Sequence, residues 1–205
     1  MDADPSVDAR LDAAVDELYG LTGDAFLPRR GQLAAAARAG GDTELAKAIT
    51  ALRKPTQSAW AINLLSRECA EELDRLADLA ARLRTAQERL DGAALLTLGR
   101  ERTALVDELV AQAHVVVTQA GAKFSPAMAR DIGTTFVAAL ASTEATAAVT
   151  SGRLTRALEY AGFGEIDLTE ATARPLRLVR SDERASLLSS VAGADAHLEA
   201  PTADD

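Results

Sequence analysis

The 205-residue chain has few of the residues that most often carry chemistry, with one cysteine and two histidines. A single cysteine excludes an internal disulfide framework and favours a reducing compartment. Cys69 falls at a position predicted to face the core, so we expect an inert buried thiol rather than a nucleophile. His114 and His197 have no ligand partners at suitable spacing. This excludes a histidine–cysteine zinc site but leaves an all-carboxylate Mg²⁺ or Ca²⁺ site open.

Catalytic motifs are missing as well. Gly40-Gly41 and the Gly-Phe-Gly at 162–164 lack the surrounding glycine, lysine and serine or threonine of a phosphate loop. No serine occurs in the glycine-flanked context of a nucleophile elbow. We therefore expect a protein that is not an enzyme, with no cofactor and no catalytic residue.

Long apolar runs are absent too. No stretch approaches the ~18 uncharged apolar residues that a membrane-spanning helix requires. The acidic N-terminus has no apolar segment of a signal peptide, so we expect a cytoplasmic protein without a membrane partner. The formal net charge of −9 argues against a surface built for nucleic acid or anionic lipid.

Only 3% of the residues are aromatic although 48% are hydrophobic. The core must consist mainly of alanine, leucine and valine, which suits closely packed helices better than a sheet and predicts an all-α fold. Apolar stripes separated by glycines predict helices over 7–19 and 24–39. A third helix, starting at 42 or 43, is predicted to bury Leu45, Ile49 and Leu52.

The rest of the chain is organised around residues 51–65. Pro55 disfavours helix at Lys54, so one helix should end near Arg53 and another begin at about Thr56. Apolar residues then recur in a 3-4 pattern, which predicts a helix of about 50 Å over 56–90. Its core-facing positions are Ile62, Leu65, Cys69, Glu72, Leu76, Leu79, Leu83, Ala86 and Leu90.

A second long helix is predicted over 93–120, after a turn at Asp91-Gly92. Two long helices joined by a short turn fold back on each other. We therefore predict an elongated helical bundle with a long antiparallel helical hairpin at about 56–120. Glu72 is the one charged residue on the apolar seam, and we hypothesise that it pairs with Arg102 and fixes the register of the hairpin.

Ser125-Pro126 is a helix start signal, and Met128, Ile132, Phe136 and Leu140 follow at steps of four residues. This predicts a helix to about residue 148, the most buried of the bundle. A short last helix is predicted over 153–161. We expect a single helical domain over 7–164 and a poorly ordered acidic tail over 165–205.

Three passages resemble a group of actinobacterial all-helical proteins. They are Asp-Glu-Leu-Tyr-Gly-Leu-Thr-Gly-Asp-Ala-Phe at 16–26, Leu-Arg-Lys-Pro-Thr-Gln-Ser-Ala-Trp-Ala-Ile-Asn at 52–63, and Arg-Leu-Thr-Arg-Ala-Leu-Glu-Tyr-Ala-Gly-Phe-Gly at 153–164. In that group a similar pattern precedes a long coiled-coil-like helix. The resemblance covers about residues 10–165 and implies the architecture and a bacterial origin, but it carries no site or activity over to this chain. Three lysines against nineteen arginines also fit a bacterium with GC-rich DNA.

Two functional hypotheses remain open. The first is a scaffold or protein-interaction module that binds a protein partner or itself through an apolar seam, formed by Trp60, Ile62, Leu65, Leu76, Leu79 and Leu83. The alternative is a protein that binds nucleic acid or another polyanion with a basic face at 29–54, through Arg29, Arg30, Arg53, Lys54 and Thr56. The purely structural interpretation of Arg53 and Lys54 is that they interact favourably with the negative end of the preceding helix. Trp60 is expected to be a packing anchor between helices rather than a stacking platform.

Overall fold

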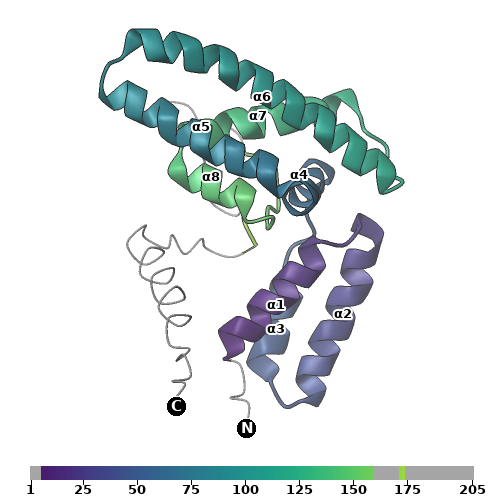
Figure 1. The fold of residues 1–205 in the computed structure, drawn as a ribbon. Helices are drawn as coiled ribbons and strands as arrows, with labels where there is room; N and C mark the ends of the chain where they lie inside the picture. The colour runs from purple at the N-terminus through teal and green to yellow at the C-terminus, as the bar shows by residue number, and fades with distance from the viewer. Residues whose placement is uncertain (1–5, 159–170, 174–205) are drawn as a thin grey trace, which may run out of the picture.

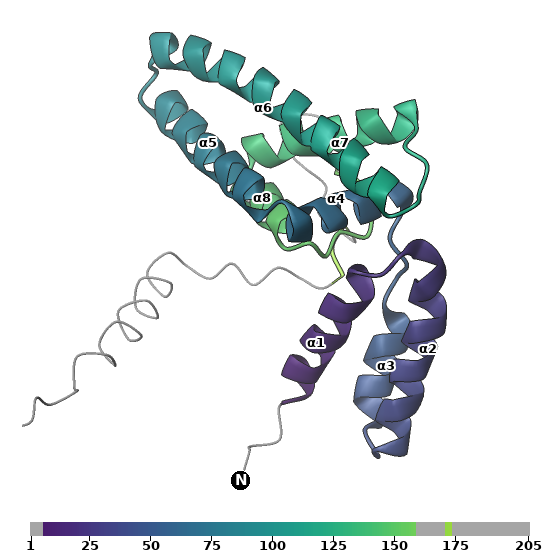
Figure 2. The same ribbon diagram turned by 45° about the vertical axis from the view of Figure 1, so that its right-hand side comes forward.

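The computed structural model describes residues 6–158 and 171–173, which form eight α-helices and no β-strand (Figure 1). The predicted all-α fold is confirmed. The helices are α1 (Val7–Tyr19), α2 (Gly23–Ala39), α3 (Thr43–Ala51), α4 (Gln57–Glu68), α5 (Ala70–Glu88), α6 (Gly92–Gln119), α7 (Pro126–Ala141) and α8 (Thr143–Thr150). They form two groups, α1–α3 and α4–α8, that meet at the linker between α3 and α4 (Figures 1 and 2).

The first group is a small three-helix bundle whose helix ends follow the sequence signals closely. Ser6 caps α1 through a hydrogen bond from the Ala9 N–H, and Asp42 caps α3 in the same way. The turn between α2 and α3 passes through Gly41, whose φ of 82° suits glycine. Where α1 meets α2, the rings of Tyr19 and Phe26 are both buried and pack edge to face.

The second group is built around the hairpin of α5 and α6. Helices α7 and α8 pack along it, and α4 crosses at the end that faces the first group (Figure 2). All five helices contribute to one apolar core, which also includes Leu154, Leu158 and Ala171. The core is mostly alanine, leucine and valine, as the composition predicts.

The expected helix over 56–90 is divided at Cys69, which is a correction to the prediction. Cys69 has φ −130° and ψ 55°, outside the helical region, so α4 and α5 run in different directions. Two consecutive seam positions, Cys69 and Glu72, offer little apolar surface to hold a continuous helix against α6. The side chain of Asn63 instead fixes α4 to the backbone of Leu154. The antiparallel hairpin is real but begins at Ala70.

Two more helix predictions are wrong. The helix expected over 126–148 is interrupted at Ser142, whose hydroxyl caps α8 through the Ala145 N–H. Residues 153–158 are not helical, because Leu154 forms a bridge with Thr172 and its backbone is bound by Asn63. The remainder of the expected 153–161 helix lies outside the described residues. Ala171 is fully buried, so part of the body of the fold lies within the predicted tail at 165–205.

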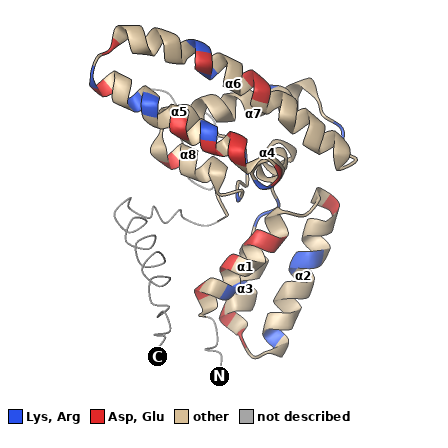
Figure 3. Ribbon diagram, in the orientation of Figure 1, with Lys and Arg blue, Asp and Glu red and all other residues tan. Residues whose placement is uncertain are grey.

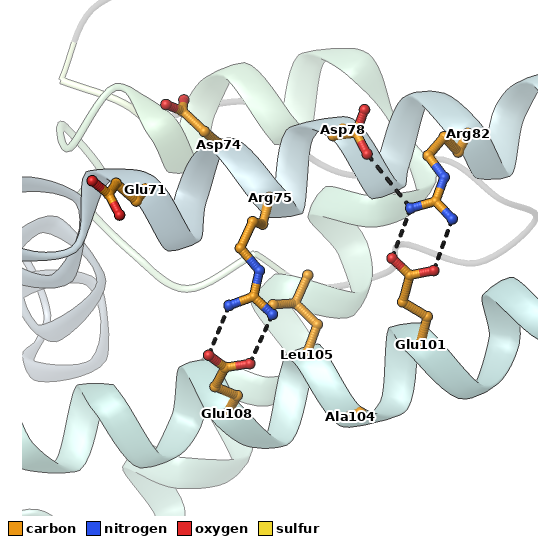
Figure 4. Close-up of a pocket in the computed structure, with 9 residues that line it drawn as sticks. All are labelled: Glu71, Asp74, Arg75, Asp78, Arg82, Glu101, Ala104, Leu105 and Glu108. Atoms are coloured by element: carbon orange, nitrogen blue, oxygen red, sulfur yellow. Dashed lines mark hydrogen bonds and ion pairs between the residues drawn. The ribbon is translucent and has the colours of Figure 1, made fainter.

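The register of the hairpin can be read from two exposed ion pairs, Arg75 with Glu108 and Arg82 with Glu101 (Figure 4). The helices are antiparallel, so three residues back along α5, from 75 to 72, correspond to three residues forward along α6, from 108 to 111. Glu72 is therefore level with position 111. Arg102 lies nine residues away along α6 (102 to 111), about 13 Å at ~1.5 Å per residue. The hypothesised Glu72–Arg102 pair is therefore wrong.

Candidate functional site

The apolar seam predicted as an interaction surface lies inside the molecule. Trp60, Ile62, Leu65, Leu76 and Leu79 are buried in the core of the second helix group, and Leu83 is partly buried against it. These side chains contact α6, α7 and α8 of the same chain rather than solvent. The surface available to a partner is therefore not this seam.

Part of the predicted basic face lies at the linker. Arg29 pairs with Glu17, and Arg30 donates a 2.6 Å hydrogen bond to the carbonyl of Leu52, the residue before Arg53. In Figure 3 acidic side chains lie among the basic ones on α5 and α6, whereas on α2 the acidic residue is at its start. A polyanion-binding face at 29–54 stays a prediction.

The linker between the two helix groups is held by its own backbone. The Tyr19 hydroxyl donates a 2.6 Å hydrogen bond to the carbonyl of Arg53, and Pro55 is buried. Thr56 caps α4 through the Ala59 N–H, while its own N–H donates to the carbonyl of Thr155. Burial of the Tyr19 phenol raises its pKa to about 12, against smaller opposing effects of the cations Arg30 and Arg53. The linker therefore has a fixed path, with the Lys54 side chain on its surface.

On one side of the linker, Asp16 of α1 binds the second group. Its carboxylate accepts two 2.8 Å hydrogen bonds from Arg153, which also reaches Asp12. Arg67 donates to the backbone carbonyls of Asp16 and Gly152. Gly152 has φ 63°, and a Cβ there would lie 2.5 Å from the Ser66 hydroxyl, so only glycine fits. This contact joins the two groups.

On the other side of the linker is a cleft of about 610 Å³ between the helix groups. The start of α2 lies next to the connection from α6 to α7 in both views (Figures 1 and 2). Residues from the first turns of α2, α4 and α7, from the linker and from the α6–α7 connection line this cleft: Thr22, Gly23, Asp24, Lys54, Pro55, Gln57, Trp60, Ala120, Gly121, Ala122, Lys123, Ser125 and Met128. Three helix N-termini therefore converge on it.

The charge distribution in the cleft favours an anion. Lys54 lies across the start of α2, since a Cβ on Gly23 would be 3.5 Å from the Lys54 ammonium nitrogen. The N-terminus of α2 has no side-chain cap, so its positive end faces a second positive charge. Lys123 lines the same cleft, and Asp24 is the one acidic residue there.

The C-terminus of α6 also reaches the cleft, and three of its last carbonyls are occupied. They accept hydrogen bonds from the N–H groups of Ala120, Gly121 and Ala122, a helix end that Gly121 permits with its φ of 76°. These bonds satisfy part of the negative end of α6.

Trp60 belongs to the base of this cleft. The side chain is 7% exposed, and among the described residues its indole nitrogen finds no hydrogen-bond acceptor. Buried donors without an acceptor are rare in native proteins, because leaving one unpaired costs free energy. Trp60 is the packing anchor that the sequence predicts, with an unused donor as well.

Comparison with protein-family models, curated proteins and solved structures gives no match. The resemblance to actinobacterial helical proteins stays a prediction. The chemistry of the cleft itself is therefore the guide to what it can bind.

The sequence predicted Lys54 as an anion contact but missed Lys123. A signal was present, because each lysine precedes a helix-capping hydroxyl by two residues, Lys54 before Thr56 and Lys123 before Ser125. These are two of only three lysines in the chain. This local signal does not predict that Lys54 and Lys123, which are 69 positions apart in the sequence (54 to 123), line one cleft.

A second cavity, between α5 and α6, is lined mainly by charged residues (Figure 4). Both of its arginines are held by carboxylates: Arg75 by Glu108, and Arg82 by Glu101 and Asp78. Exposed ion pairs of this kind stabilise a fold only weakly, because water screens them. Glu71 and Asp74 also line this cavity and form no ion pair with a described residue, but two exposed carboxylates do not make a ligand site.

The remaining chemistry of the described residues is sparse. They contain no cluster of three or more potential metal ligands, and none of their helices could cross a membrane. Cys69 lies at the break between α4 and α5, where burial and the nearby Glu72 and Glu68 raise the pKa of its thiol. A raised pKa lowers the reactive thiolate fraction, consistent with the inert thiol expected from the sequence.

Proposed function

We propose that the protein is a non-enzymatic binding protein, acting in the cytoplasm, that holds a small anionic ligand in the cleft between its two helix groups. The observation that carries this proposal is the Lys54 ammonium lying against the uncapped start of α2. Cations favour helix C-termini, so this arrangement places two positive poles together. An anion in the cleft would interact favourably with both poles.

Lys123 supports the proposal as a second cation that lines the same cleft. It comes from the α6–α7 connection, a different helix group from α2. A ligand that contacts both lysines would therefore bridge the two groups. The scattered basic residues elsewhere and the net charge of −9 favour a small anion over a nucleic acid.

The three lysines of the chain provide a matched test. Lys54→Gln and Lys123→Gln each remove one charge from the cleft, while Lys47→Gln removes the same charge from an exposed pair with Glu44 on α3. Binding of inorganic phosphate would be followed by isothermal titration calorimetry. We expect each cleft variant to weaken binding about tenfold, since a charged hydrogen bond contributes roughly 1.5–3 kcal/mol.

The Lys47→Gln variant should bind like the wild type. Equal weakening in all three variants would mean that phosphate responds only to net charge. No saturable binding at millimolar phosphate would remove the proposal altogether.

Protein interaction remains a second proposal, now on a different surface. At the tip of the α5–α6 hairpin, Leu90 is 88% exposed and Leu96 is 72% exposed. Leu90 also has a φ of 53°, because it is the left-handed residue that ends α5, where the Asp91 N–H donates to the carbonyl of Ala86. A tip-mediated self-association would be seen as a salt-independent mass increase by light scattering, and it would disappear in a Leu90→Asn, Leu96→Gln double variant.

A further inference from the structure

We infer that the ligand of the cleft is a phosphomonoester of metabolite size, whose phosphate binds between Lys54 and Lys123 and whose organic part lies against Trp60. This inference rests on the proposed function and adds the chemical class of the ligand. Three features carry it: the size of the cleft, the gradient of its lining, and the choice of lysine for both of its cations.

The size argues against a bare ion. Cavities of roughly 300–1,000 Å³ hold organic ligands in proteins, and the cleft has about 610 Å³. A lone phosphate would fill a small part of that space and leave the rest to water. A ligand with an organic body would fill it.

The lining changes from charged to apolar with depth. Lys54, Lys123 and Ser125 are exposed at the mouth, where the helices begin. One turn further along α4 and α7, Trp60 and Met128 are buried and line the same cleft. A ligand that presents a charged group outward and an apolar part inward matches this gradient.

The choice of cation favours phosphate over carboxylate. The planar fork of arginine matches a carboxylate, whereas lysine binds phosphate as a point charge. The chain has nineteen arginines but uses two of its three lysines in this cleft. Two ammonium groups and the free amides at the start of α2 together suit a dianion.

The ring of Trp60 supplies a further contact. Its N–H is buried beneath the surface, but the residue lines the cleft and is 7% exposed. The organic part of the ligand would lie against the exposed edge of the ring. Inorganic phosphate held at the lysines, one helical turn away, would not touch it.

The test uses the full-length chain and the single indole ¹H–¹⁵N resonance. Probes are inorganic phosphate, glycerol 3-phosphate and AMP, with glycerol and adenosine as matched compounds without phosphate. We expect at least one phosphomonoester to bind about tenfold more tightly than inorganic phosphate by calorimetry. That ester should shift the indole resonance because its organic part lies against the ring, while inorganic phosphate leaves the resonance in place. Lys54→Gln should weaken every phosphate probe, and Trp60→Phe should remove only the advantage of the ester.

The outcomes separate this inference from the proposal beneath it. If inorganic phosphate binds as tightly as both esters, or if a saturating ester leaves the indole resonance unmoved, the cleft recognises a small anion only and the inference is overturned. If adenosine or glycerol binds as well as its ester, or if no phosphate probe binds, the proposed function falls too. Because the indole resonance is measured in the wild type, the test decides between these outcomes even if the Trp60→Phe variant is unstable.

Discussion

Truncating Leu76 should unfold the protein rather than dissociate it, because the apolar seam is internal. Leu76 is fully buried on α5, in the core formed with α6 and α7. Replacing a buried leucine by alanine costs about 3–5 kcal/mol through lost burial and the cavity left behind. Helix propensity hardly changes, since both residues favour helices. For a chain of this size the loss corresponds to a decrease in melting temperature of roughly 6–20 °C.

The matched control is Leu96→Ala, the same substitution on the partner helix of the hairpin. Leu96 is mostly exposed, so its truncation should change stability by about 0.5 kcal/mol or less. Both variants would be followed by urea denaturation with circular dichroism, and their mass would be measured by light scattering. A Leu76→Ala variant that keeps its urea midpoint but falls from dimer to monomer would place the seam between chains and refute the assignment.

Two other predictions concern the contacts around the linker. Asn63→Leu should cost about 2–6 kcal/mol in urea denaturation, because the buried N–H and carbonyl of Leu154 would both lose their partner, whereas Ser66→Ala nearby should cost little. A small effect of Asn63→Leu would mean that the 154 segment contributes little to folding. The pKa of Tyr19, raised to about 12 from the ordinary 10.0 of a tyrosine, means that the folded state retains the phenolic proton more strongly than the unfolded state. The stabilisation is complete below about pH 10 and is lost between about pH 10 and 12, so the stability advantage of the wild type over Tyr19→Phe should narrow in that window and stay constant below it.

Local signals predicted the fold where helices end at their own caps. The boundaries of α1–α3 followed from apolar stripes, the glycines between them and Pro55 after α3, all within a few residues of the helix ends. Prediction failed where a distant contact decides the backbone. The break at Cys69 accompanies the attachment of Asn63 to Leu154, 91 positions along the chain, which no helical period encodes.

The same distinction explains the candidate site. Lys54 could be predicted because its proline and capping threonine are adjacent in sequence. That Lys123 and the start of α2 share this cleft with Lys54 could not be predicted, because the turn after α6 meets the first helix group only through tertiary packing. Arg153 was likewise missed as the partner of Asp16, since it lay within a segment predicted to be helical.

The arrangement of contacts around the linker argues for a preformed cleft rather than a hinge that closes on its ligand. Arg153 holds the Asp16 carboxylate through two bonds, and Tyr19 and Thr56 fix the linker backbone on the way to the cleft. Opening the cleft would therefore separate several directional contacts at once. Water at the mouth and the carboxylate of Asp24, which lines the same cleft, reduce the repulsion between Lys54 and the start of α2. A ligand then replaces water at a site that is already assembled, so little of its binding free energy is lost to reordering the chain.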